Sequence, residues 1–244
     1  MVVFGTEENF KTNRRPISVG DDTYYKSEWM EAGDDPILSP TIFMIEQPAN
    51  TTLVAHFHRQ NQFQLFVDGS GSIGRYGIEA VTVHYAGAYT PYGPLLSGPD
   101  GLKYLTIRPV RESGGFAVPD EVASMRRGPK AHAQAGPITV MSSEELLTLT
   151  AAREDTLIPT SSDGMGIAVH TLPAHAPFAA PDMDNSQGVF VVVLAGSIVA
   201  DDKNLQKWES LFITPGEPVL WAVAGNTGAQ VALLLCPELH EAYR

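Results

Sequence analysis

Three short patterns occur twice along this chain, in the same order. Each is a short apolar or turn segment that ends in glycine or proline, and the second copies follow at roughly half the chain length. An internal duplication explains this order more simply than chance, so we predict two similar domains. The matched segments are 67–69 with 194–196, 91–93 with 214–216, and 107–109 with 235–237.

Segments of strand length surround these patterns. They are rich in Val, Ile, Leu and Phe, and turn residues separate them in a chain with 22 Gly and 18 Pro. Short strands at close spacing are typical of sandwiches and barrels, so we predict an all-β fold. The predicted strands are 41–45, 53–58, 62–67, 80–85 and 102–109 in the first half, and 166–172, 189–194, 211–216, 219–223 and 231–236 in the second.

The repeat also predicts the organisation of the chain. The polar, turn-rich beginning is interpreted as an arm, and the glycine- and proline-rich middle as a linker. Within this linker Ser142 precedes Glu145 at the spacing of a capping box, which predicts one short helix. The predicted parts are an N-terminal arm (1–40), a first barrel (41–110), a linker (111–165) and a second barrel (166–244).

Composition argues against several classes of function. The net charge of −12 argues against a nucleic-acid partner. No apolar segment has the length of a membrane span and no signal peptide is recognisable, so we expect a cytoplasmic protein. The single cysteine, Cys236, cannot form an intrachain disulfide and lies in a buried strand pattern. No glycine-rich phosphate loop or serine-hydrolase elbow is present, so no nucleotide cofactor is expected.

The main candidate for a functional site is the pair His56 and His58, at the end of a predicted strand. Side chains alternate along a strand, so residues two apart point to the same face. Two imidazoles that converge in this way form half of a metal site. Gln62 follows His58 by four residues, and Gly69 follows Gln62 by seven.

These residues resemble the first motif of the cupin superfamily, Gly-x5-His-x-His-x3-4-Glu-x6-Gly. His56, His58 and Gly69 stand at the family positions. Gln62 stands where the family has its glutamate, and Asn50 where it has the leading glycine. The resemblance implies a β-barrel with the site inside, and one altered ligand.

The family's second motif includes Pro-x-Gly-x2-His. Pro91 and Gly93 fit it, while Leu96 stands where the last histidine ligand belongs. Together with the repeat, the resemblance covers residues 40–110 and 165–240 and implies the two-domain, or bicupin, form. The implied fold is two tandem double-stranded β-helix (jelly-roll) barrels with a short helix in the linker. Family habit also implies a homodimer.

The second repeat departs further from the cupin pattern. Counting from Gly196 and Gly216, apolar or amide residues stand at most of the ligand positions. We therefore expect a degenerate barrel with no metal, whose role is structural, with Trp221 inside it. The residues at the ligand positions are Met183, Asp184, Asn185, Val189 and Val219.

The resemblance implies a metal held by His56, His58 and Gln62. Replacing the glutamate with Gln62 removes the negative charge that favours a divalent cation, and Leu96 removes a further donor. Imidazole pairs still attract Fe, Mn, Ni or Zn, so a divalent transition metal is one expectation. The other is that both histidines are hydrogen-bonded to Gln62 or Gln64 without metal.

Further side chains are predicted to bind a small-molecule substrate. Gln64 shares a strand face with Gln62, and His84 is a candidate replacement ligand as well as a pocket residue. Polar groups near the barrel mouths suit an oxyanion or an aromatic substrate. The predicted substrate-binding residues are Gln64, Tyr76, His84, Tyr89 and Arg108, with Tyr92 as a further mouth residue.

Two functional hypotheses follow. In the first, the N-terminal barrel is a metal-dependent enzyme for a small organic substrate, either dioxygenase-like or an isomerase or lyase. In the second, the protein is a metal-free bicupin that binds or senses a small ligand. A purely structural storage role is disfavoured, because storage cupins are secreted.

Overall fold

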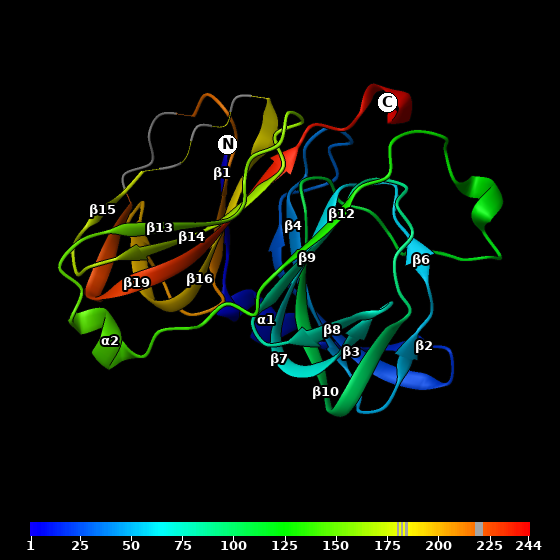
Figure 1. Cartoon of the computed structure of the whole chain (residues 1–244), viewed down its shortest axis with the longest axis horizontal. Coiled ribbons are helices and arrows are strands. Elements are labelled where there is room, and N and C mark those ends of the chain that lie inside the picture. Colours follow the sequence, from blue (N-terminus) through cyan, green and yellow to red (C-terminus); the bar gives the residue numbers. More distant parts are fainter. Residues whose placement is uncertain (180, 182, 184, 218–221) are drawn as a thin grey trace. The chain divides into compact units, whose positions relative to one another are not determined.

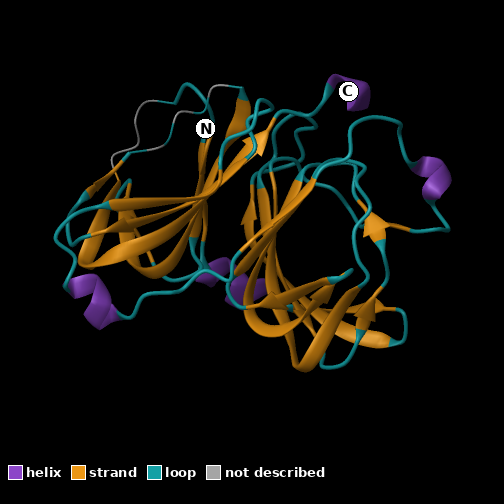
Figure 2. Cartoon of the chain, in the orientation of Figure 1, coloured by secondary structure: helices purple, strands orange, loops and turns teal. Residues whose placement is uncertain are grey.

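The computed structural model describes residues 1–179, 181, 183, 185–217 and 222–244. The chain forms two compact units, each built mainly from strands (Figures 1 and 2). We call residues 8–138 and 239–244 the N-terminal barrel, and residues 1–7 and 139–238 the C-terminal barrel. The all-β prediction is therefore confirmed.

The N-terminal barrel has an antiparallel sheet of nine described strands, in the order β12-β9-β7-β10-β4-β3-β2, with β5 on β10 and β8 on β7. A separate pair joins β6 (His56–Phe57) to β11 (Phe116–Ala117). The nine strands are β2 (Arg15–Val19), β3 (Asp22–Glu31), β4 (Thr41–Gln47), β5 (Thr52–Leu53), β7 (Gln62–Ile73), β8 (Tyr76–Glu79), β9 (Thr82–Ala86), β10 (Leu95–Arg108) and β12 (His132–Ala135).

The C-terminal barrel has eight described strands, in the order β1-β18-β16-β19-β14-β13, with β15 on β19 and β17 on β16. The helical segments of the chain are α1 (Glu7–Asn13), α2 (Ser143–Leu147), η1 (Val122–Ser124) and η2 (Glu241–Tyr243). The eight strands are β1 (Val2–Gly5), β13 (Arg153–Ile158), β14 (Gly166–Leu172), β15 (Pro177–Phe178), β16 (Ser186–Ala200), β17 (Lys203–Leu205), β18 (Ser210–Ile213) and β19 (Ala222–Pro237).

The duplication is visible in matching glycines. Gly69 in β7 has φ +81° and packs so tightly on the Gly101 carbonyl that a Cβ would overlap it. Gly196 in β16 has φ +67° and meets Gly228 in the same way, 127 residues further along in both cases (69 to 196, 101 to 228). Only glycine tolerates both this φ and this approach, so these repeated glycines bend equivalent strands of the two barrels.

The first 40 residues differ from the predicted arm. Strand β1 pairs with β18 in the C-terminal barrel, whereas β2 and β3 extend the sheet of the N-terminal barrel beyond β4. Polar composition hid these strands, but Tyr24, Trp29 and Met30 of β3 are buried. An uncovered β4 would expose unpaired backbone groups, and β3 supplies the partner.

The predicted linker is also divided between the barrels. Strands β11 and β12 belong to the N-terminal barrel, whereas α2 and β13 belong to the C-terminal barrel. The helix begins where predicted: Ser142 accepts a hydrogen bond from the Glu145 amide, and the Glu145 side chain bonds back to the Ser142 amide. The capping box therefore predicted where the helix begins, but the local sequence could not show to which barrel the helix belongs.

The C-terminal barrel has an apolar core. Val189, at the position of the family glutamate, is fully buried with Val191, Val193 and Leu233. Burial raises the pKa of the Cys236 thiol, which leaves it unreactive. Asp184, Val219 and Trp221, which the repeat pattern also singled out, lie outside the described residues. In the described part of the chain, none of the helices has the length and apolar character that a membrane crossing requires.

Strand β1 should contribute to the stability of the C-terminal barrel. Phe4 packs against its core, so Phe4→Ala should lower the free energy of unfolding by about 2 kcal/mol, less than for a fully buried phenylalanine. Leu147→Ala, which removes a side chain exposed on α2 of the same unit, is the control and should change it little. Calorimetric unfolding of both variants tests this, and equal transitions would contradict the assignment of β1.

Candidate functional site

The N-terminal barrel encloses a cavity of about 350 Å³, at the small end of ligand-pocket volumes. Alternate residues of three neighbouring strands form the walls of this cavity. Phe43 and Ile45 of β4, Gln62 and Gln64 of β7, and Tyr104, Thr106 and Arg108 of β10 all line it. Members of each set are two residues apart, so all point to the inner face.

Arg108 lies at the polar end of this cavity and is only 3% exposed. Its Nε donates to Gln62 Oε1 at 2.8 Å, and its Nη1 donates to the Glu112 carbonyl oxygen at 3.0 Å. Its Nη2 lies 3.1 Å and 3.2 Å from the two ring nitrogens of His58. The guanidinium thus joins β10, β7 and the loop after β10.

No carboxylate of a described residue lies within 4.0 Å of the Arg108 guanidinium, although the charges of Glu112 and Glu28 act on it from farther away and raise its pKa. The carboxylate of Glu112 lies 3.3 Å from His58 Nδ1 and accepts from the Arg59 amide. Burial lowers the pKa of Arg108, yet a guanidinium stays protonated at neutral pH. A buried cation that no carboxylate contacts directly is costly, so the cavity favours an anion.

The two histidines are held in different ways. His56 Nδ1 lies 2.8 Å from the Val54 carbonyl, and its backbone pairs with Tyr92 at 3.1 and 3.0 Å. The rings of His56 and His58 are 5.2 Å apart at nearly a right angle. Burial and the charge of Arg108 lower the pKa of His56, and the same two causes lower that of His58 to about 4. Both are therefore neutral at pH 7.

Glu112 adds a negative charge close to Arg108 and His58. Burial raises the pKa of its carboxyl, but the hydrogen bond with His58 and the charge of Arg108 lower it more, so the net shift is downward. Its backbone carbonyl accepts from Arg108, while its carboxylate faces His58. The loop residue therefore closes the polar end of the cavity as an anion directed at the histidine.

A second polar chain fills the inside of the barrel behind this end. Gln62 Nε2 donates to the Tyr92 hydroxyl at 2.7 Å, and burial raises the pKa of Tyr92 to about 12. His84 Nδ1 lies 3.2 Å from Gln64 Oε1, and its ring centroid is 5.2 Å from that of Tyr92. Both glutamines are therefore oriented by hydrogen bonds before any ligand arrives.

The structure brings six of the sequence-predicted residues into one cavity. His56, His58, Gln62, Gln64, Tyr92 and Arg108 all line it. They come from three strands, β6, β7 and β10, from the residue that follows β6, and from Tyr92, which pairs with His56 in an isolated bridge. Strand parity was the signal that identified Gln64, and Arg108 was named as a mouth residue.

Three predicted residues lie elsewhere. Tyr76 is 40% exposed and its hydroxyl accepts from Arg75, because β8 lies at the margin of the sheet. Tyr89 is buried between Phe57 and Tyr243, in a separate apolar cluster. His84 lies behind Gln64 and lines a smaller pocket with Tyr76. These residues do not line the main cavity.

Sequence reasoning missed several cavity residues. Glu112 follows Arg108 closely in a loop that was interpreted as linker. Tyr24 and Lys26 come from β3, in the segment interpreted as an arm. Their two-residue spacing was an available signal of a strand face, but the polar residues around it concealed it.

The predicted metal ligands do not fit a divalent cation in this arrangement. The Gln62 oxygen accepts from Arg108, and the same guanidinium lies against both nitrogens of the His58 ring. A metal bound there would adjoin a buried positive charge. The prediction of His56, His58 and Gln62 as a ligand set is therefore not supported by their contacts.

No protein-family model and no curated protein matches this sequence. Solved structures match it through the fold. Bacterial pirin YhhW from Escherichia coli, in complex with nickel(II), is 13% identical with a TM-score of 0.58 over 97% of this chain and 99% of that chain. Oxalate decarboxylase of Bacillus subtilis, which has Mn(II) centres, is 12% identical with a TM-score of 0.58 over 95% of this chain and 77% of that chain.

These neighbours are cupins, and the chain has the cupin fold that its first motif predicted. Identities of 12–13% establish the shared fold and not a shared site. The chemistry of the cavity must therefore be argued from the residues of this chain.

The buried His84 should make stability depend on pH. Burial, followed by the charge of His132, lowers the pKa of His84 from 6.5 to about 3. As pH falls below 6.5, the unfolded chain binds this proton and the folded chain does not. The contribution is intact above pH 6.5 and is lost toward pH 3, which should cost on the order of 2–3 kcal/mol.

Denaturant unfolding at a series of pH values measures this effect. His84→Gln should show a shallower loss of stability on acidification than the wild type. His175→Asn, at an exposed position with φ +61° in the C-terminal barrel, is the control and should keep the wild-type slope. An unchanged slope in His84→Gln would contradict the prediction.

Proposed function

We propose that the N-terminal barrel binds a small organic anion, without a metal ion, through the guanidinium of Arg108. The observation that carries this proposal is a buried guanidinium that lines a cavity and has no carboxylate within 4.0 Å among the described residues. Buried charges are normally paired, and a bound anion would complete the pair.

The hydrogen bonds of Arg108 support a carboxylate as the anionic group. A guanidinium has five N–H donors, and the contacts with Gln62 Oε1, His58 Nε2 and the Glu112 carbonyl use one each. Two N–H groups then remain for a ligand, which suits the two oxygens of a carboxylate. The small cavity and its apolar remaining walls favour this group over a phosphate, which needs more donors.

A metal-dependent enzyme, dioxygenase-like or an isomerase or lyase, is the second candidate. It is favoured by one observation, the nickel(II) and Mn(II) of the structural neighbours. In this chain Arg108 already contacts two of the three predicted ligands, so its guanidinium would have to move before a metal could bind. The ligand-binding function of a metal-free, two-barrel cupin is therefore preferred, and a homodimer remains a prediction.

Removing the buried charge tests the first proposal. Arg108→Met should weaken the binding of phenylacetate about 100-fold, because hydrogen bonds to a charged group are each worth about 1.5–3 kcal/mol. Lys103→Met is the matched control: it removes an exposed cation from the same strand, where Lys103 pairs with Asp68, and should leave binding unchanged. Isothermal titration calorimetry measures both, and equal affinities would contradict the proposal.

An internal counter-ion separates the two candidates. Gln62→Glu would place a carboxylate at the atom that accepts from Arg108 Nε at 2.8 Å, so it should neutralise the cation and weaken phenylacetate binding by about tenfold or more. It should not create a metal site. Near-stoichiometric Fe, Mn, Ni or Zn in elemental analysis of the wild type or of Gln62→Glu, lost in His56→Ala, would instead support the metal-dependent candidate.

A further inference from the structure

The free nitrogen of His56 adds a second requirement to the Arg108 cavity. A carbonyl oxygen only accepts hydrogen bonds, so the 2.8 Å contact with Val54 places the ring proton of neutral His56 on Nδ1. Nε2 then carries a lone pair and can only accept. Among the described residues, no donor lies at hydrogen-bond distance from this atom.

This acceptor is open to the cavity. The His56 ring lines it, and Nε2 is not among the polar atoms that are sealed in the protein without a partner. Gly115 packs against the adjacent Cδ2 edge, where a Cβ would lie at 2.9 Å, so the glycine keeps this edge of the ring uncovered by a side chain. A ligand that fills the cavity would therefore meet Nε2 directly.

The polar end of the cavity consequently offers donors and an acceptor close together. Arg108 lies 3.1 Å from the His58 ring, and that ring lies 5.2 Å from the ring of His56. A carboxylate supplies acceptors for Arg108 but no donor for His56 Nε2. Because buried polar groups are normally paired, the ligand should carry a hydrogen-bond donor beside its carboxylate.

The charges around the cavity favour a hydroxyl over an ammonium as this donor. Arg108 would repel a neighbouring ammonium group, and the Glu112 carboxylate is already engaged by His58 and the Arg59 amide. A neutral hydroxyl avoids this repulsion and still donates one hydrogen bond.

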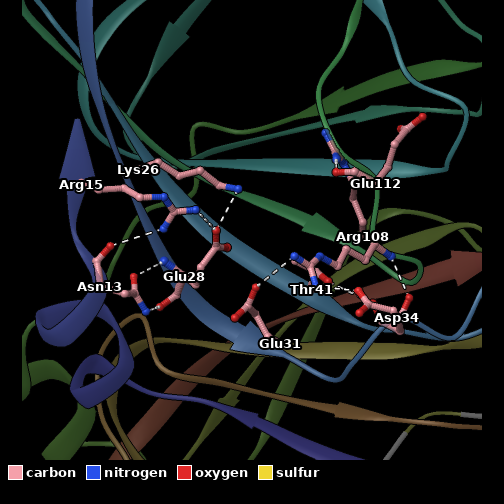
Figure 3. Close-up of polar contacts among 11 residues, drawn as sticks. Asn13, Arg15, Lys26, Glu28, Glu31, Asp34, Thr41, Arg108 and Glu112 are labelled. Atoms are coloured by element: carbon pink, nitrogen blue, oxygen red, sulfur yellow. Dashed lines mark hydrogen bonds and ion pairs between the residues drawn. The ribbon is translucent and has the colours of Figure 1, made fainter. Parts of the chain in front are cut away.

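The remaining walls indicate a single carboxylate and an apolar body. Ile17, Val19, Ile45 and Leu53 supply aliphatic surface. Lys26 is the other cation of the lining, but its Nζ lies 2.8 Å from Glu28, onto which Arg15 also converges (Figure 3). A second carboxylate on the ligand would have to compete with that ion pair.

From these contacts, and resting on the proposed function, we infer that the ligand is an apolar 2-hydroxy monocarboxylic acid. Its carboxylate binds Arg108, its hydroxyl donates to His56 Nε2, and its side chain occupies the apolar walls. His56 is then the residue that selects hydroxy acids over plain acids, and Arg108 the residue that holds both.

Calorimetric titration with matched acids tests this inference. The better-binding enantiomer of mandelate should bind wild-type protein about tenfold more tightly than phenylacetate, which lacks only the hydroxyl. Its methyl ether, 2-methoxy-2-phenylacetate, retains the oxygen but cannot donate, so it should lose this gain in the unaltered protein. Phenylglycine, with an ammonium in place of the hydroxyl, should bind more weakly than mandelate.

Variants assign the gain to its residue. His56→Phe should abolish the difference between mandelate and phenylacetate. Arg108→Met should lose the binding of both mandelate and phenylacetate. The methyl ether gives the same information on the wild type if His56→Phe does not fold.

The outcomes separate the inference from the proposed function. Equal binding of mandelate and phenylacetate, still dependent on Arg108, would overturn the hydroxy-acid inference and leave the anion site in place. Tighter binding of phenylglycine than of mandelate would overturn the choice of a hydroxyl. Absence of binding by all four acids at millimolar concentration would overturn both.

Discussion

The buried guanidinium of Arg108 is the interaction on which the rest of the N-terminal barrel depends. It is satisfied by neutral acceptors, the Gln62 oxygen, His58 Nε2 and the Glu112 carbonyl, and it contacts no described carboxylate directly. These contacts connect two strands and a loop at the point where the cavity is polar. Because charge is expensive in a protein interior, the same group that organises the cavity also defines what should bind there.

The two barrels show how one fold can carry opposite interiors. Equivalent glycines, Gly69 and Gly196, bend equivalent strands, yet polar Gln62 lies in one barrel and apolar Val189 in the other. Burial of apolar side chains stabilises a closed core. The desolvation of the polar groups that line a cavity must instead be offset by hydrogen bonds and by a bound ligand. This division agrees with a binding role for the N-terminal barrel and a structural role for its partner.

Much of the site could be predicted from local pattern, because strand parity is a local property. It placed His56 and His58 on one face and Gln64 beside Gln62, and all four line the cavity. Tyr76 and Tyr89 were proposed from proximity to the barrel mouths, which parity does not encode, and they lie elsewhere. The strands of residues 1–40 were missed because many of their residues are polar, and in β3 even the polar Ser27 and Glu28 are buried beside Trp29 and Met30.

The sequence by itself determined the duplication, most strands, the capping box and the histidine pair that lines the cavity. Only the tertiary structure decided that Arg108, 46 residues from Gln62, would donate to the oxygen that was expected to bind a metal. The reason is physical: periodicity records which face a side chain takes, but not which inward groups meet across the barrel. Whether the amide oxygen of Gln62 binds a metal ion or accepts from a guanidinium depends on which side chains face it from the neighbouring strands.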